Sequence, residues 1–389
     1  MKINLYPLVS RLHDYSSISI ETTVLLNDMK NYGDFDFFQT DLQSFKDADM
    51  SIIVVQSGGS EGLFVEIESQ ISEPYYLLTL GNNNSLAASI EILAYLKDKD
   101  KEAEILHGSA KYIASRLLEL NKLIEKPITN LGIIGKPSDW LIASNVDYLK
   151  MYDFYRVKLI DIDILELVEL YSKTALEIDS YEDFVSYDRL ETKKALRLHL
   201  AINELVSKYS LKGFTIRCFD LIDKINTTGC LSLGLFNESG IVAGCEGDIP
   251  SMISMYLLKE ITGQSSFMAN PSRIDVERQE VVFAHCTIPL NMTNHLELMT
   301  HYESNKGIGL RGKLKEEEIT IFKISNKTKN FFVEEGKIIQ NLEENNLCRT
   351  QILVRMDNVE YFLTEPNGNH HCIVYGKHKR KIIDFIRKI

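Results

Sequence analysis

The chain has 389 residues, with 43 Lys and Arg against 55 Asp and Glu and a formal net charge of −12 at pH 7. This length exceeds the ~100–200 residues of one ordinary domain, so we expect two or three domains and exclude a single small binding module. Hydrophobic residues at 44% and charged residues at 25% are typical of a folded protein and exclude wholesale disorder.

The first third of the chain repeats a strand–turn–helix pattern. Predicted elements are strands at 51–55 and 75–80 and helices at 63–71, 86–97 and 109–123. Ser85 can cap the second of these helices. This order predicts a doubly wound, Rossmann-like α/β domain over residues 1–127.

The same pattern resumes after Pro127. Predicted elements are strands at 131–135, 157–162, 214–218 and 240–245, a helix capped by Asn145, and a crossover helix at 195–209. We therefore expect a second doubly wound α/β domain over residues 128–264.

After residue 265 the apolar pattern changes from helical to alternating. Short strands are predicted at 280–284, 319–324, 330–333, 351–356, 359–363 and 371–375, followed by a helix at 379–389. Residues 265–389 are thus expected to form a β-rich domain, either a small barrel or a sandwich. The predicted fold class is α/β, with two Rossmann-like domains followed by a barrel-like one.

Basic residues gather only near the C-terminus, at Lys377, Lys379, Arg380, Lys381, Arg387 and Lys388. A phosphate backbone requires a larger positive field, and cations near the end of a helix suit its dipole. We interpret this cluster as the solvated face of the last helix and expect no nucleic-acid partner.

Six cysteines are spread along the chain without a C-x-x-C pair, which predicts buried, reduced thiols rather than disulfides or a zinc site. The N-terminal segment lacks the continuous apolar stretch of a signal peptide. No later window approaches the ~20 apolar residues of a membrane span. We expect a cytoplasmic protein with no membrane partner.

Three glycine-bearing turns follow predicted strands, at 57–60, 81–85 and 135–138. In a parallel sheet such turns face the ligand crevice, and their backbone N–H groups can bind phosphates or hydroxyls. None of them matches a dinucleotide fingerprint or a P-loop. They indicate the side of the sheet on which a site lies, or they serve only as tight turns.

The segment 243–250, Ala-Gly-Cys-Glu-Gly-Asp-Ile-Pro, places Glu246 and Asp248 between a strand and a helix. Asp248 is the better cap for that helix. His285 ends a predicted strand, and His370 and His371 follow a turn. A carboxylate and imidazoles at strand ends can bind a divalent ion, although each of these residues taken alone is more often structural.

Several blocks of the sequence, in the same order, resemble the L-fucose isomerase and L-arabinose isomerase superfamily, specifically its shorter fucose-isomerase-like proteins. The blocks lie at 54–62, 81–85, 135–144, 217–219, 243–248, 266–270, 284–286 and 368–371. The resemblance runs from about residue 50 to the end. It implies a divalent metal ion, usually Mn²⁺, an aldose–ketose interconversion through an enediol, and a trimer or hexamer.

Carried over residue by residue, the resemblance implies that Glu246 is a metal ligand and base and that His285 and His371 are ligands, with His370 as the rival of His371. The family's second carboxylate is missing, because Asn270 stands at or next to its position. An amide oxygen can contact a metal or substrate but cannot accept and return a proton.

Three further residues are expected at the site. Trp140 can form an apolar platform for a sugar or pack in the core, and Arg217 can bind sugar hydroxyls or form a structural ion pair. Asp248 can contact the substrate, as can His370, and Asp248 or Asp275 can replace the missing acid. The sequence thus predicts a sugar isomerase-like protein acting on a pentose or deoxyhexose. The alternative is a catalytically silent sugar-binding or regulatory relative.

Overall fold

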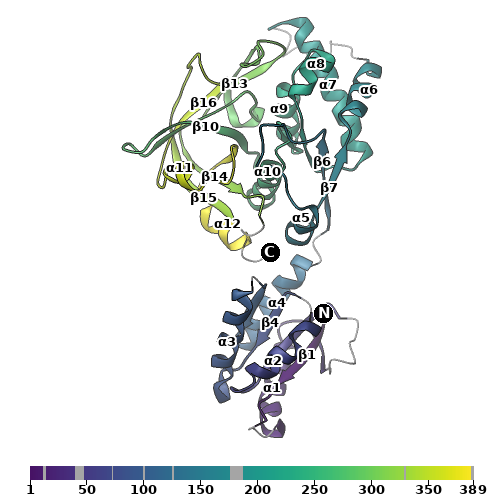
Figure 1. Ribbon diagram of the computed structural model, residues 1–389, viewed down its shortest axis with the longest axis vertical. Coiled ribbons are helices and arrows are strands. Elements are labelled where there is room, and N and C mark those ends of the chain that lie inside the picture. The colour runs from purple at the N-terminus through teal and green to yellow at the C-terminus, as the bar shows by residue number, and fades with distance from the viewer. Residues whose placement is uncertain are drawn as a thin grey trace. The chain divides into compact units, whose positions relative to one another are not determined.

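The computed structural model describes residues 1–11, 15–39, 48–71, 73–99, 101–124, 127–175, 187–327 and 330–386 (Figure 1). They divide into two compact units, Met1–Lys126 and Pro127–Ile389. The finer division into domains at 1–127, 128–264 and 265–389 stays a prediction. Arg387 and Lys388 of the basic cluster, with the end of the last predicted helix, lie outside the described residues.

The first unit contains a parallel sheet in the order β2-β1-β3-β4-β5. Its strands are β1 (Lys2–Leu8), β2 (Asp36–Gln39), β3 (Met50–Val55), β4 (Tyr75–Leu78) and β5 (Ala103–Leu106), and its helices are α1 (Tyr15–Met29), α2 (Glu61–Ile67), α3 (Ser85–Asp98) and α4 (Ala110–Ile124). Successive side chains of a strand point to opposite faces. Ile52 and Val54 therefore pack with α4, whereas Ile53 and Val55 pack with α2 and α3.

The second unit begins with a parallel sheet in the order β7-β6-β8-β9. Its strands are β6 (Thr129–Ile134), β7 (Val157–Ile162), β8 (Gly213–Ile216) and β9 (Val242–Gly244). The helices are α5 (Tyr148–Tyr155), α6 (Ile164–Lys173), α7 (Arg189–Lys208), α8 (Phe219–Ile225), α9 (Cys230–Ser239) and α10 (Ile249–Thr262). The chain then enters a closed antiparallel barrel.

The barrel strands run in the order β10-β11-β16-β15-β14-β17. They are β10 (Phe267–Asp275), β11 (Glu280–His285), β14 (Glu318–Ile324), β15 (Phe331–Asn341), β16 (Thr350–Met356) and β17 (His371–Tyr375). A hairpin, β12 (Thr293–Met299) and β13 (Gly309–Leu314), and two helices, α11 (Tyr361–Thr364) and α12 (Lys379–Ile386), complete the unit. The predicted fold class, two parallel α/β sheets followed by a β-barrel, is confirmed.

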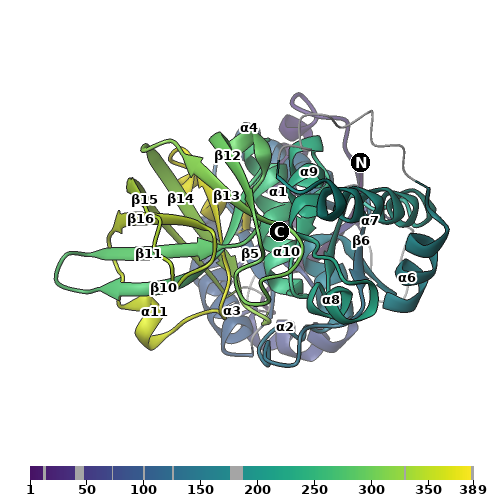
Figure 2. The ribbon, with the colours of Figure 1, turned by 90° about the horizontal axis from the view of Figure 1, so that it is seen from above.

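Helix α10 lies between the sheet and the barrel of the second unit (Figure 1, Figure 2). It packs against β8 and β9 on one side and against β14 and β17 on the other. Met268, Phe322 and Cys372 of the barrel belong to the same core as the sheet. The two parts therefore form one packed unit, and the end of β9 meets the barrel at the start of α10.

Three local predictions are wrong. Helix α5 is capped by Asp147, which accepts hydrogen bonds from the N–H groups of Leu149 and Lys150, and not by Asn145. Ser85 is the first residue inside α3 rather than its cap. Residues 359–363 do not form a strand, because α11 occupies Tyr361–Thr364.

No described helix is both long and apolar enough to cross a bilayer.

Candidate metal centre

Glu246 stands in the turn between β9 and α10. Its φ of 60° and the φ of 72° at Gly247 are left-handed, and a Cβ on Gly247 would lie 2.5 Å from the carbonyl oxygen of Lys136. The Ser138 N–H donates to the Glu246 carbonyl at 2.9 Å, and the Gly247 N–H donates to that of Ile216 at 3.0 Å. A strained backbone at a non-glycine residue, held in this way from two sides, is typical of a functional position.

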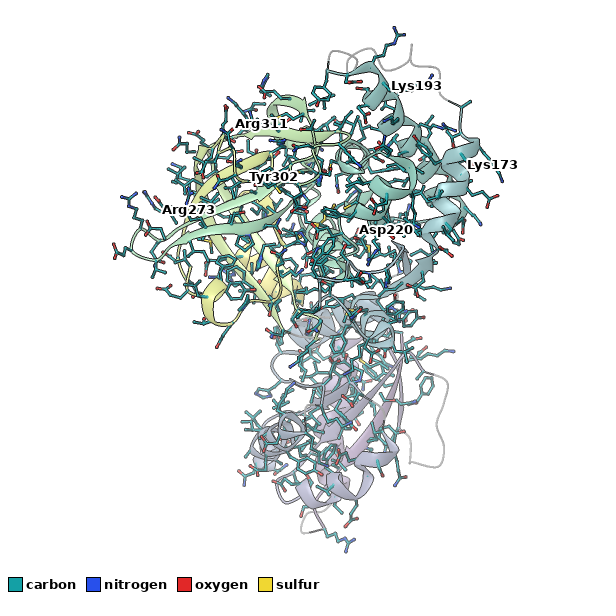
Figure 3. The ribbon with its side chains drawn as sticks, turned by 45° about the horizontal axis from the view of Figure 1, so that its top comes forward. Lys173, Lys193, Asp220, Arg273, Tyr302 and Arg311 are labelled. Atoms are coloured by element: carbon teal, nitrogen blue, oxygen red, sulfur yellow. The ribbon has the colours of Figure 1, made fainter. Side chains whose placement is uncertain are left out.

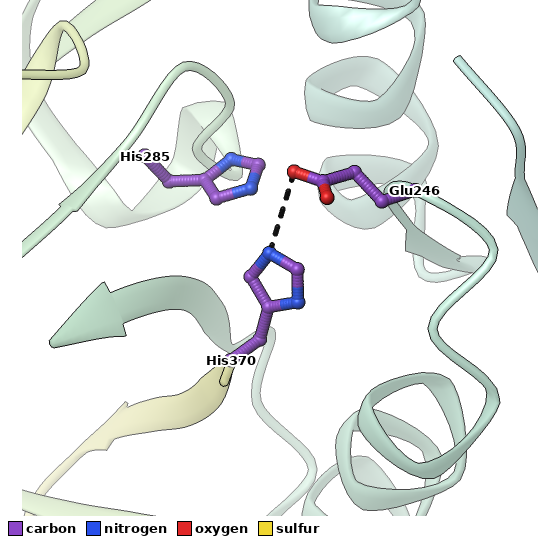
Figure 4. A group of neighbouring side chains, drawn as sticks. All are labelled: Glu246, His285 and His370. Atoms are coloured by element: carbon purple, nitrogen blue, oxygen red, sulfur yellow. Dashed lines mark ion pairs between the residues drawn. The ribbon is translucent and has the colours of Figure 1, made fainter. Parts of the chain in front are cut away.

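Three side chains from separate elements converge at this turn: Glu246, His285 at the end of β11, and His370 just before β17 (Figure 4). One ligand atom of each lies within 4.8 Å of those of the other two. His370 Nε2 is 3.5 Å from Glu246 Oε1, and the two imidazole centroids are 5.3 Å apart. Both histidines are buried, and the Glu246 side chain is 13% exposed.

His370 Nε2 is a buried polar atom with no hydrogen-bond partner in the described part of the chain. Its 3.5 Å contact with the Glu246 carboxylate is too long for a strong hydrogen bond. Buried polar atoms are rarely left in this state, so this one requires an explanation. A carboxylate oxygen with two imidazole nitrogens suits a borderline or hard divalent ion, and the three residues therefore fit a metal.

The charges around the centre are strongly coupled. Burial alone would raise the pKa of Glu246, but the charges of His370 and His285 outweigh burial and lower that pKa to about 2. Burial alone would lower the pKa of His370, but the carboxylates of Glu246 and Asp248 raise it to about 9. Burial and the charge of His370 lower the pKa of His285 to about 3. The two carboxylates thus favour the protonated form of His370, and a cation bound at Nε2 would have to displace that proton.

Asp248 lies behind His370. The Asp248 Oδ2 is 2.9 Å from Nδ1 of His370, and its Oδ1 accepts the N–H of Ser251 at 2.9 Å. The prediction that Asp248 caps helix α10 is confirmed. Both carboxylate oxygens of Asp248 are already engaged by buried groups, and its predicted contact with substrate stays a prediction.

Trp140 contacts the other oxygen of Glu246. The indole Nε1–H donates to Glu246 Oε2 at 2.6 Å, and the ring stands edge-on to Phe219 with centroids 4.9 Å apart. The residue is 54% exposed, so the core-packing alternative does not describe it. Trp140 orients the carboxylate, and its role as a platform for a sugar stays a prediction.

Arg217 is engaged in structural bonds. Its guanidinium donates to Asp220 at 2.8 Å, to the carbonyl of Pro137 at 2.6 Å and to Asp139 at 2.7 Å (Figure 3 labels Asp220). These bonds hold the loop that carries Trp140. A predicted contact of Arg217 with sugar hydroxyls would have to compete with them.

His371 points away from Glu246. Its Nε2 is 3.1 Å from the Tyr361 hydroxyl, its Nδ1 is 3.1 Å from the Asn369 carbonyl oxygen, and its ring packs against Phe362 with centroids 4.9 Å apart. The structure therefore brings His370, and not His371, to the centre. Successive side chains of a strand point to opposite faces. The side chain of His371, the first residue of β17, lies inside the barrel, and that of His370 therefore lies on the opposite face.

Asn270 lies on β10 opposite Ala284. Ala269 belongs to the barrel core, whereas Met268 belongs to the core shared with the sheet. Alternation along the strand places Asn270 on the same face as Met268. Its Oδ1 is buried and has no hydrogen-bond partner among the described residues. Asp275, the suggested substitute acid, lies at the far end of β10 and pairs with Arg278.

Two residues near the centre were missed in the sequence. His301 and Glu303 lie between β12 and β13, and both are within electrostatic range of Glu246. Burial lowers the pKa of His301, whereas partial burial and the charge of Glu246 raise the pKa of Glu303. No spacing in the sequence connects this segment with Glu246, so no signal could have found them.

The fold and this centre define a class: a protein with two parallel α/β sheets and an antiparallel barrel, carrying a buried Glu–His–His group that can hold a metal ion. No family model matches the chain. Similarity to individual proteins narrows the class further.

Sulfoquinovose isomerases of Priestia megaterium and Priestia aryabhattai are each 30% identical to the chain over 130 residues, which is 32% of this chain and 29% of theirs. The sulfoquinovose isomerase of Alkalicoccus urumqiensis is 22% identical over 266 residues, which is 64% of this chain and 58% of its own. Each match thus spans less than two thirds of the relative. The chain is a distant homologue of sulfoquinovose isomerases. These matches support a relationship of the chain to sugar isomerases, but they do not identify it as a fucose or arabinose isomerase.

Proposed function

We propose that the chain binds a divalent ion, Mn²⁺, through Glu246, His285 and His370 and isomerises an aldose to a ketose through an enediol. The observation that carries this proposal is the buried Nε2 of His370, which has no hydrogen-bond partner among the described residues and faces a carboxylate and a second imidazole. The distant homology with sulfoquinovose isomerases supports the reaction class.

Isomerisation moves a proton between C1 and C2 of an open-chain sugar and needs stabilisation of the charge that develops on O1 and O2. A divalent ion supplies that stabilisation as a Lewis acid and template. Glu246 and the two histidines hold the ion, while the indole of Trp140 keeps one oxygen of Glu246 in place. The hydroxyl groups of a sugar are uncharged, so their binding does not require positively charged side chains around the centre.

The proton carrier is a separate question. A carboxylate with a pKa of about 2 is a weak base near neutral pH, so Glu246 is better suited to holding the ion than to the base role predicted from the sequence. Asn270 cannot carry a proton and serves as a weak ligand or substrate contact. Glu303 is a surface-exposed carboxyl within electrostatic range of Glu246, and its Gln variant tests whether it carries the proton.

The substrate is proposed to be a pentose, a deoxyhexose, or sulfoquinovose itself, the sugar named in the relatives. The second candidate function is a silent sugar-binding or regulatory protein. Asn270 favours this candidate, because an amide whose oxygen has no hydrogen-bond partner among the described residues stands where the resemblance places an acid.

An isomerase assay with Mn²⁺ on a panel of these aldoses tests the proposal. Wild type should convert one of them, and Glu246→Gln should abolish conversion, whereas Glu344→Gln, which removes a partly exposed carboxylate paired with Arg273, should not. If Glu303 carries the proton, Glu303→Gln should lower kcat by about 10²–10⁴-fold with little change in Mn²⁺ affinity.

Asn270→Asp separates the two functions. For a slow enzyme, the added carboxylate should raise kcat. If neither wild type nor Asn270→Asp converts any sugar, while either protein binds one, the enzyme proposal fails and the silent candidate stands.

A further inference from the structure

Lys323 is buried at a place where a barrel strand would ordinarily carry an apolar residue. It lies on β14 with its side chain 1% exposed. Ile319 and Ile321, four and two residues earlier on the same face, belong to the barrel core. Burial of an ammonium group costs several kcal/mol unless the charge is paired.

Its partner is Asp248. Lys323 Nζ lies 3.3 Å from both carboxylate oxygens of Asp248 and also donates to the hydroxyl of Ser251. The Asp248 carboxylate is therefore held by donors from three segments: Lys323 on β14, the Ser251 N–H on α10, and His370 before β17. The other ring nitrogen of His370, Nε2, faces Glu246.

We propose that Lys323 is a positioning residue that acts through Asp248 on His370, so that Nε2 of His370 points to the metal centre. This inference rests on the proposed metal function. Metal-binding histidines commonly donate their second N–H to a carboxylate, which fixes the ring and its tautomer. Lys323 extends that arrangement by one residue and compensates the charge of a carboxylate that is itself fully buried.

Stability alone does not account for the pair. Replacement of a buried ion pair by apolar residues of similar volume is often neutral or stabilising, so a buried pair is weak evidence of a stabilising role. Lys323 stands at the end of an apolar column inside the barrel, where a methionine would continue the packing. A role in orienting His370 gives the charge at this position a function.

The first test is Lys323→Met with Mn²⁺ affinity measured by calorimetry. We expect the affinity to fall by about 10–100-fold, the usual effect of losing an outer partner of a metal ligand. The visible spectrum of the Co²⁺-loaded protein, which reports ligand geometry, should change as well. Ile321→Ala is the matched control, because it removes packing from the same face of β14 without touching Asp248. It should lower the melting temperature but leave the affinity and spectrum unchanged.

A double-mutant cycle tests whether Lys323 acts through Asp248. Asp248→Asn should weaken Mn²⁺ binding, and adding Lys323→Met to it should cause less than about threefold further loss, because the intermediary is already altered. The double variant carries no unpaired charge and should fold. If Lys323→Met does not fold, Lys323→Gln replaces it in the cycle with the same expected outcomes.

Unchanged affinity and spectrum in Lys323→Met would overturn the inference, as would fully additive losses in the cycle. Equal losses in Lys323→Met and Ile321→Ala would reduce Lys323 to a packing residue and also overturn it. A wild type that binds no Mn²⁺ would instead remove the proposed function and, with it, this inference.

Discussion

His370 and His371 are adjacent but lie in different surroundings, and we propose that they have different roles, which substitution can separate. His370→Ala removes the Nε2 that faces Glu246 and the contact with Asp248. Because loss of an outer partner alone costs 10–100-fold in metal affinity, loss of the ligand should cost at least about 100-fold at pH 7, or about 2.8 kcal/mol. His371→Ala should leave the Mn²⁺ affinity within about threefold of wild type.

The pH supplies a second magnitude for the same pair of variants. In wild type the ion displaces a proton from His370, whose pKa is about 9. Because pH 7 lies about two units below that pKa, this competition lowers the Mn²⁺ affinity by about 100-fold, or about 2.7 kcal/mol. The His370→Ala variant has no such competition. Its deficit relative to wild type should therefore grow about tenfold between pH 7 and pH 8.

His371→Ala should show the opposite profile of effects. It removes the 3.1 Å contact of the buried Tyr361 hydroxyl, which retains the hydrogen bond from the Asn367 N–H, and should cost about 0.5–1.5 kcal/mol of unfolding free energy. Calorimetric Mn²⁺ titrations and urea unfolding of both variants measure these quantities. A His371→Ala variant that loses metal affinity while His370→Ala retains it would refute the assignment and restore the ligand implied by the resemblance.

Three further predictions concern the charge on His370, the loop of Trp140 and the oligomeric state. The raised pKa of His370 contributes stability that is fully present below pH ~6.5 and is lost as the pH rises through about 9. The melting temperature of the ion-free protein, measured by calorimetry, should therefore fall over that interval. A constant melting temperature would contradict the charge coupling. Arg217→Met releases Asp139 and the loop that carries Trp140, the one tryptophan of the chain. The fluorescence emission of Trp140 should therefore shift to the red, and the Mn²⁺ affinity should drop about 3–10-fold. An unaltered emission spectrum would show that Arg217 does not hold the loop. The trimer or hexamer implied by the resemblance stays a prediction that light scattering tests, and a monomer at micromolar concentration would contradict it.

The fold class could be predicted from local patterns because each pattern reports a burial environment. Residues 51–55 form a short, mostly apolar run, as expected of a strand buried on both faces, and they lie in β3. Residues 157–162 instead carry exposed polar side chains between buried apolar ones, as expected of an edge strand, and they form β7. The change to alternation after residue 265 likewise reports a sheet with one face in a barrel core. Residues 359–363 were predicted wrongly because a run of five residues with alternating apolar positions also suits a short helix packed by Tyr361 and Phe362.

Part of the site could be predicted because strand ends and caps have local signals. Glu246 and His285 follow strands, and Asp248 precedes a proline that can start a helix. The choice between His370 and His371 could not be made, because it depends on where β17 begins, to within one residue. Boundaries of that precision are set by pairing with β10, in which His371 lies opposite Ala269.

Lys323 offered a signal that was not used. A lysine within the apolar run 318–324, Glu-Ile-Thr-Ile-Phe-Lys-Ile, breaks the pattern of a barrel strand, and such a break calls for a buried partner. The partner, Asp248, is 75 residues away in the sequence, and it can be identified only from the packing of α10 against β14.

The central claim is that Glu246, His285 and His370 hold one divalent ion. Crystals of the protein soaked in Mn²⁺, measured at the manganese absorption edge, test it most directly. We predict one anomalous peak per chain, at about 2.0–2.3 Å from a Glu246 oxygen and from a ring nitrogen of each of the two histidines. The absence of a peak there at millimolar Mn²⁺, or a peak bound instead by His371, would contradict the account.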